Sequence, residues 1–190
     1  MSLIELFKSH VQNHWESHCH RNQMAEFLGG YYSGALGVHI YHDLKDCVKN
    51  DDEALYMWGK AMEHLHHDEK ELYEEASGKA MQLTEPLLED CKMLNKYNVV
   101  RAESDEWFTT FWSQENAMEQ MFANIEEHPF KVWWNSLGAM AYWKIGIYYG
   151  MGYSYGRFWT RLMGHPSWNA DLTKIQFVPP QEEVATNALL

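Results

Sequence analysis

Apolar residues recur along the chain at the three- and four-residue spacing of amphipathic helices, and no run shows the alternation typical of strands. The pattern predicts six helices. They cover about residues 2–28, 31–49, 52–78, 84 to a loop at 98–103, 105–126 and 129–164. We therefore predict an all-α fold, with one helical domain over residues 1–164 and an extended tail over residues 165–190.

The predicted boundaries rest on turn and cap residues. Gly29 and Gly30 are interpreted as the stop of the first helix. Residues 50–52 supply an N-cap for the third helix, and Pro86 is interpreted as an early residue of the fourth. The last helix is expected to be continuous and bent at one of its glycines.

Two glutamates fall inside apolar stripes when these helices are drawn as continuous. Glu69 lies in the stripe of residues 52–78, and Glu115 in that of residues 105–126. A buried, unpaired carboxylate costs several kcal/mol or takes up a proton. We therefore expect a metal, a cation, a shared proton or a polar substrate beside each glutamate, and we interpret both as candidate catalytic residues.

Histidines and a further acid extend this candidate site. Two histidines lie in the stripe of the first helix, a third lies one turn before Glu69, and Glu119 lies one turn after Glu115. Carboxylates and imidazoles that converge inside a helical bundle bind metals such as iron or manganese. The predicted metal ligands are His14, His18, His66, Glu69, Glu115 and Glu119.

A lysine offers an explanation without metal. Lys144 sits among apolar residues of the last predicted helix and is a possible partner for a buried glutamate. Such a pair would make the protein a structural bundle. A further alternative is that a bend exposes Glu69 or Glu115 to solvent or to a subunit contact.

The last helix is rich in tyrosine and tryptophan, which either fill the core or line a pocket for a flat ligand. If they line a pocket, the candidate substrate-binding residues are Tyr142, Trp143, Tyr149, Lys144 and Asp43. A non-catalytic variant of this hypothesis is a protein that binds an aromatic molecule or a tetrapyrrole, with His14 or His18 as the axial contact.

Charge narrows the range of partners. The formal net charge is −12, and no run of lysine or arginine offsets it. This argues against a nucleic-acid-binding surface and against an anionic membrane. Residues 133–159 are nearly apolar, but Asn135, Lys144 and Arg157 interrupt them, which favours a buried helix over a membrane span.

The cysteines and the N-terminus bear on the compartment. Cys19, Cys47 and Cys91 are odd in number and far apart, which fits a reducing compartment better than a disulfide framework. The first ten residues lack the apolar core of a signal peptide. We therefore expect a cytoplasmic protein.

Two segments resemble the heme-oxygenase-like superfamily, which includes thiaminase-II (TenA-like) enzymes, quinone-cofactor synthases of the PqqC type and diiron oxidases. Residues 62–75 (MEHLHHDEKELYEE) are similar to its acidic, histidine-containing helix, and residues 135–150 (NSLGAMAYWKIGIYYG) to its pocket-lining helix. The resemblance implies a helical bundle in which Glu69 is a pocket acid and His66 a possible ligand. Ala141 replaces the thiaminase cysteine, and Lys144 stands where diiron members carry a carboxylate.

Together these patterns predict an enzyme that acts on a small molecule in a buried pocket. Glu69 and Glu115 would bind iron for an oxidation, or one of them would serve as a general base. The alternatives are the non-catalytic binding protein and the structural bundle described above. Association of the chain into a homo-oligomer is left open.

Overall fold

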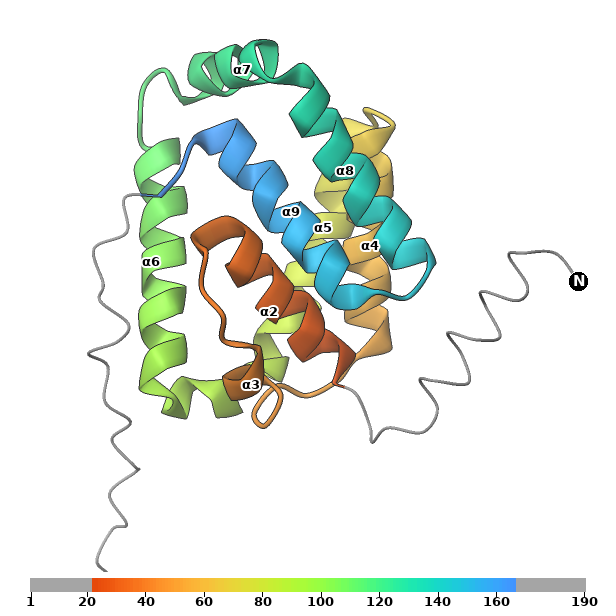
Figure 1. Cartoon of the computed structure of the whole chain (residues 1–190), viewed down its shortest axis with the longest axis vertical. Helices are drawn as coiled ribbons and strands as arrows, with labels where there is room; N and C mark the ends of the chain where they lie inside the picture. The colour runs from red at the N-terminus through yellow and green to blue at the C-terminus, as the bar shows by residue number, and fades with distance from the viewer. Residues whose placement is uncertain (1–21, 167–190) are drawn as a thin grey trace, which may run out of the picture.

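The computed structural model describes residues 22–166, and Figure 1 shows that they form an all-α fold. The all-α prediction is confirmed for this part of the chain, in which no strand occurs. A short 3-10 helix, η1 (Asp90–Met93), accompanies the α-helices. The α-helices, labelled as in Figure 1, are α2 (Gln23–Leu36), α3 (Tyr41–Leu44), α4 (Asp52–His66), α5 (Lys70–Leu87), α6 (Asn95–Trp112), α7 (Ala117–Glu127), α8 (Pro129–Lys144) and α9 (Tyr148–Met163).

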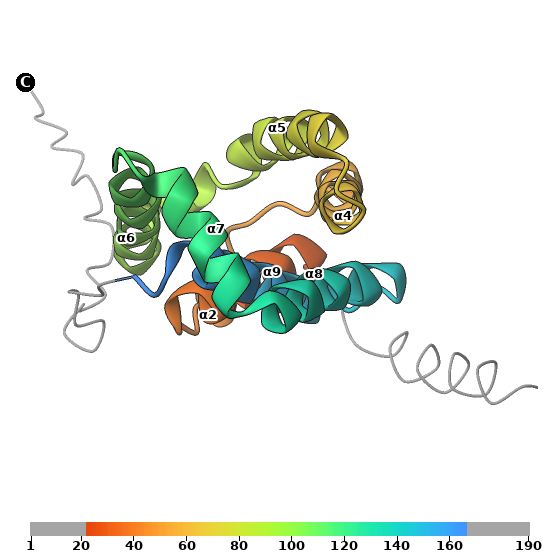
Figure 2. The same ribbon diagram turned by 90° about the horizontal axis from the view of Figure 1, so that it is seen from above.

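Helices α2 and α9 pack against each other at the centre of the fold, and α8 lies beside α9 (Figures 1 and 2). Glycines spaced four residues apart on both helices make the α2–α9 contact. A β-carbon added at Gly30, Gly34, Gly152 or Gly156 would lie 1.9–2.4 Å from a carbonyl oxygen of the opposite helix. The two backbones therefore touch, which glycine alone permits.

The first predicted helix boundary is wrong for this reason. Gly29 and Gly30 lie inside α2, where Gly30 meets the backbone of α9. The helix ends instead at Gly37, whose left-handed backbone (φ 71°) lets its amide donate to the carbonyl of Ser33 at 3.1 Å. Gly29 and Gly30 therefore permit close packing. From the sequence pattern alone, such glycines cannot be distinguished from glycines that end a helix.

The predicted helix over residues 52–78 is two helices. The Asp51 carboxylate caps α4 by accepting a hydrogen bond from the amide of Ala54 at 2.8 Å. The chain then leaves the helix at Asp68, whose φ is +60°, and α5 begins at Lys70. Pro86, expected near a helix start, lies in the last turn of α5.

The two remaining long predicted helices are also divided. Residues 113–116 separate α6 from α7. Gly146, with φ +73°, reverses the chain between α8 and α9, so these two helices form an antiparallel pair and not one bent helix. This reversal brings the faces of two aromatic-rich helices together.

Aromatic and aliphatic side chains form two buried clusters that join the helices. Phe27 of α2 packs against Trp58 of α4 and Tyr155 of α9, with ring centroids 5.6 and 6.4 Å away, and the latter two rings also contact each other at 5.4 Å. The Trp58 indole also donates a hydrogen bond to the Thr84 hydroxyl of α5 at 3.0 Å. A second cluster joins α2, α6, α7 and α9, and its buried members are Ala35, Trp107, Phe111, Ala117, Phe158, Leu162 and Met163.

The cysteines differ from expectation. Cys47 and Cys91 form a disulfide between the segment after α3 and η1, although 44 positions separate them. The tertiary fold brings their α-carbons to 5.0 Å, so the interpretation of the cysteines as unpaired is wrong for these two. Cys19 lies outside the described residues. Within residues 22–166, no helix has the length and apolar character needed to cross a membrane.

Candidate functional site

Glu69 is not on a core face. It is exposed at the start of α5, and its carboxylate lies 2.6 Å from the Nδ1 atom of His64. The prediction assumed one continuous helix, and the break at Asp68 rotates Glu69 out of the apolar stripe. The desolvation argument for a catalytic role therefore does not apply.

Glu115 and Glu119 are also exposed. Glu115 lies in the segment between α6 and α7, and Glu119 lies in the first turn of α7. The expectation that both acids point into the core is wrong, because the helix that would have aimed them ends at Trp112.

His66 of α4 contacts a serine of α8. Its Nδ1 lies 3.1 Å from the Ser136 hydroxyl of α8, and that hydroxyl donates to the carbonyl of Trp133 at 2.8 Å. His66 is therefore the donor, and Ser136 is not activated as a nucleophile. His14 and His18 lie outside the described residues. Within residues 22–166, no three histidine, cysteine or acidic side chains are grouped so that they could hold a metal ion.

Lys144 and Asp43 each form an ion pair with a residue that the sequence did not predict as its partner. Lys144 Nζ lies 2.7 Å from Glu63 of α4, and Lys96 Nζ of α6 lies 2.7 Å from Asp43. The lysine partner proposed for Glu69 or Glu115 thus pairs with a third glutamate, and the lysine side chain is half exposed, not buried.

Among the carboxylates of the described residues, Glu63 has the pKa that departs most clearly from its ordinary value. Hydrogen bonds from Lys144 and then from Lys60 lower the pKa of Glu63 from 4.5 to about 2. Because the folded pKa lies below the ordinary value, this group stabilises the fold above pH 4.5, and its contribution is lost as the pH falls toward 2.

Substitution of Lys144 by glutamine is expected to raise the pKa of Glu63 toward 4.5, because the largest stabilising contact of the carboxylate is removed. A carbon-detected NMR titration of the Glu63 carboxyl group measures this change. Lys92→Gln, which removes a comparable contact to Glu89, is the control and should leave the Glu63 titration unchanged. An unaltered Glu63 pKa in Lys144→Gln would contradict the assignment.

Two of the predicted substrate-binding residues line the same cavity. Tyr142 of α8 and Tyr149 of α9 border a cavity of about 610 Å³ between the two helices, named here the α8–α9 cavity. Its lining residues are Trp134, Asn135, Leu137, Gly138, Ala141, Tyr142, Tyr149, Gly150, Tyr153 and Ser154. Of the other three candidates, Trp143 instead faces α4, where its ring packs against Gly59, and Lys144 and Asp43 do not line the cavity.

Glycines shape this cavity. A β-carbon at Gly150 would lie 2.9 Å from the ring of Tyr142, and one at Gly138 would lie 3.1 Å from the Ser154 hydroxyl. The absence of side chains at these points lets α8 and α9 approach closely along one side of the cavity. Ser154 was missed by sequence reasoning, because only the reversal at Gly146 places it opposite α8.

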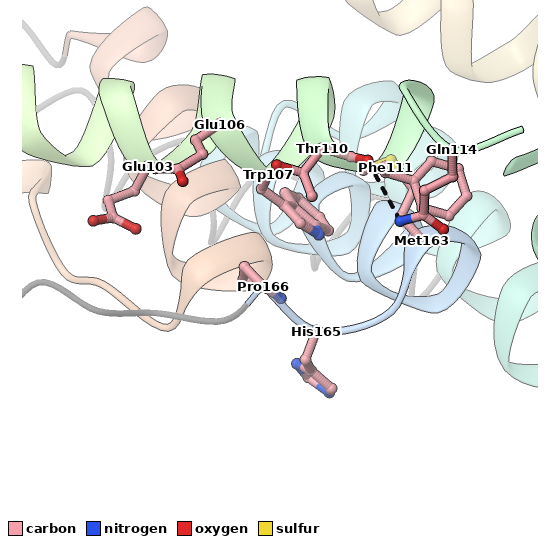
Figure 3. A pocket seen from close by; sticks show the side chains of 9 residues that line it. All are labelled: Glu103, Glu106, Trp107, Thr110, Phe111, Gln114, Met163, His165 and Pro166. Carbon is pink, nitrogen blue, oxygen red and sulfur yellow. Dashed lines mark hydrogen bonds between the residues drawn. The ribbon is translucent and has the colours of Figure 1, made fainter.

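A second cavity, of about 260 Å³, lies between α6 and the end of α9 (Figure 3). Glu103 and Glu106 lie one turn apart on α6, beside Trp107, and the His165 side chain points away from them. The Gln114 amide donates to the Thr110 carbonyl of the same helix at 3.4 Å. The polar groups here do not converge on one point, so this cavity is the weaker candidate.

The buried tyrosines of the core do not form an acid–base site. Burial raises the pKa of Tyr31 to about 12 and that of Tyr155 well above its usual value. Both hydroxyls are therefore protonated at neutral pH and act as hydrogen-bonding groups. The α8–α9 cavity remains the best candidate site in the described part of the chain.

Comparison with protein-family models, with curated proteins and with solved structures gave no match to this chain.

Proposed function

We propose that the protein binds a small aromatic molecule in the α8–α9 cavity. The observation that carries this proposal is the lining: three tyrosines and a tryptophan line an open cavity of about 610 Å³, with Asn135 and Ser154 as side-chain amide and hydroxyl groups. Binding sites for small molecules have volumes of about 300–1,000 Å³ and combine apolar walls with a few orienting polar groups. Aromatic walls favour a flat ligand, since rings stack with an offset or meet edge to face.

The lining supports binding more than acid–base catalysis. No carboxylate, imidazole, amine or thiol belongs to the residues that line the cavity. The acids that we expected to act as ligands or as a general base, Glu69 and Glu115, are exposed elsewhere. Of the functions predicted from the sequence, the non-catalytic binding protein for an aromatic ligand is therefore the one that the geometry favours. An iron- or manganese-dependent oxidation and a heme-oxygenase-like origin stay predictions.

A cavity-filling variant tests the proposal. Ala141 is exposed at the edge of the cavity, so Ala141→Phe is expected to fill it without disturbing the core. The probe is N-phenyl-1-naphthylamine, a neutral aromatic dye whose fluorescence rises in apolar sites. We expect one saturable site in the wild type and an increase in Kd of about tenfold in Ala141→Phe, equivalent to about 1.4 kcal/mol.

Ala102→Phe is the matched control, because Ala102 is exposed on α6 and does not line the cavity. It should bind the dye as the wild type does. Equal Kd values for the wild type and Ala141→Phe, or no saturable binding, would overturn the proposal. A mass that rises with protein concentration and falls in Phe130→Ser, measured by sedimentation, would instead assign the exposed rings of Phe130, Trp133 and Trp134 on α8 to a contact between copies of the chain.

A further inference from the structure

A cationic hollow adjoins the α8–α9 cavity. It has a volume of about 220 Å³ and is lined by Phe130, Lys131, Trp134, Asn135, Arg157 and Arg161. Trp134 and Asn135 line both spaces, so the hollow and the cavity meet at these two residues. A ligand in the cavity can therefore extend past Trp134 into the hollow.

Three cations of the hollow have no acidic partner in the described chain. Arg157 and Arg161 lie four residues apart and so face the same side of α9, and Lys131 comes from α8. None of the three forms an ion pair with any residue in 22–166, whereas Lys60, Lys96 and Lys144 each lie within 2.7 Å of a carboxylate. The protein has a net charge of −12, so the lack of acids at this point is a local feature.

Arg161 has an unmet hydrogen bond. Its Nε atom is buried, and no acceptor within residues 22–166 lies at hydrogen-bond distance. A buried donor without a partner costs free energy, and no contact within residues 22–166 offsets this cost at Arg161. Phe130 and Trp134, which also line the hollow, stack on each other with ring centroids 5.9 Å apart and planes at 23°.

We propose that the ligand of the α8–α9 cavity is an aromatic anion. Its ring lies in the cavity, and its carboxylate, sulfonate or phosphate group lies in the hollow against Arg157 and Arg161, with Lys131 as a third cation. A planar guanidinium matches two oxygens of such a group, and these charge-assisted hydrogen bonds are stronger than neutral ones. This inference rests on the proposed function, because it places the ring in the same cavity.

Two dyes that share one ring system test whether an anionic group on the ligand strengthens binding. 8-Anilinonaphthalene-1-sulfonate carries a sulfonate, and N-phenyl-1-naphthylamine has the same rings without it. We expect the sulfonate dye to bind the wild type about tenfold more tightly, the effect of one or two hydrogen bonds to a charged group. Arg157→Gln and Arg161→Gln should each remove most of this advantage and leave the Kd of the neutral dye unchanged.

Lys45→Gln is the charge-matched control, because Lys45 is exposed near α3 and lines neither space. It should leave both Kd values as in the wild type. Arg157→Gln supplies the test if Arg161→Gln fails to fold, which circular dichroism detects. Equal affinities of the wild type for the two dyes would overturn the anion inference and leave the proposed function standing. Failure of Ala141→Phe to weaken the neutral dye would instead overturn the proposed function.

Discussion

Gly152→Ala is expected to destabilise the protein by about 3 kcal/mol or to prevent its folding. The new β-carbon would lie 1.9 Å from the carbonyl oxygen of Phe27 and 2.8 Å from the amide nitrogen of Tyr31. Both atoms belong to the backbone of α2, so no side-chain rotation relieves the contact. The two central helices would have to separate, and the core around Phe27, Trp58 and Tyr155 would open with them.

Urea denaturation followed by circular dichroism measures this loss as a lower midpoint at constant m-value. The control is Gly78→Ala in α5, where an added β-carbon meets no atom within 4 Å. It should stabilise the protein by about 0.5–1 kcal/mol, because alanine loses less backbone entropy than glycine in a helix. A Gly152→Ala protein as stable as the wild type would refute the close packing of α2 on α9.

Phe27→Ala is expected to lower the free energy of unfolding by about 3–5 kcal/mol. The Phe27 ring is only 2% exposed and connects α2 to α4 and α9 through its contacts with Trp58 and Tyr155. Its removal leaves a cavity between helices that come from distant parts of the chain. Thermal and urea unfolding of the variant report the loss.

Phe130→Ala makes the same chemical change at a ring that is 69% exposed on α8. We expect its stability to stay within about 0.5 kcal/mol of the wild type, since little apolar area is lost from the interior. Phe130 lines the cationic hollow, so this variant should weaken the sulfonate dye even though the fold is intact. If Phe27→Ala and Phe130→Ala lowered the stability by similar amounts, the difference in burial between the two rings would be contradicted.

The helical nature of the described chain could be predicted, and so could some helix ends, such as the starts at Asp52 and Pro129, but the breaks within the long predicted helices could not. Glycine illustrates the reason. Gly29 and Gly30 looked like a helix stop, yet they lie within α2, whereas Gly37 and Gly146 take left-handed backbone angles and end helices. The same residue type permits a turn or a close helix contact, and the neighbouring helix in space decides which one occurs.

The residues of the candidate site also divide into those that the sequence predicted correctly and those that it did not. Tyr142 and Tyr149 were chosen for their aromatic character, and both line the α8–α9 cavity. Glu69 and Glu115 were chosen from their angular position on long helices, and breaks at Asp68 and at residues 113–116 expose both. The predicted direction of a side chain around a helix is wrong once the helix breaks before that residue. The chemical character of a side chain does not depend on where the helix breaks.

The sequence by itself determined that the described chain is all-α and that one region is rich in tyrosine and tryptophan, because helical periodicity and composition are local properties. Only the tertiary structure decided that Cys47 meets Cys91, that Lys144 pairs with Glu63, and that three cations gather beside an aromatic cavity. These contacts join residues that are far apart in sequence, and they depend on where each helix ends and which neighbour it packs against.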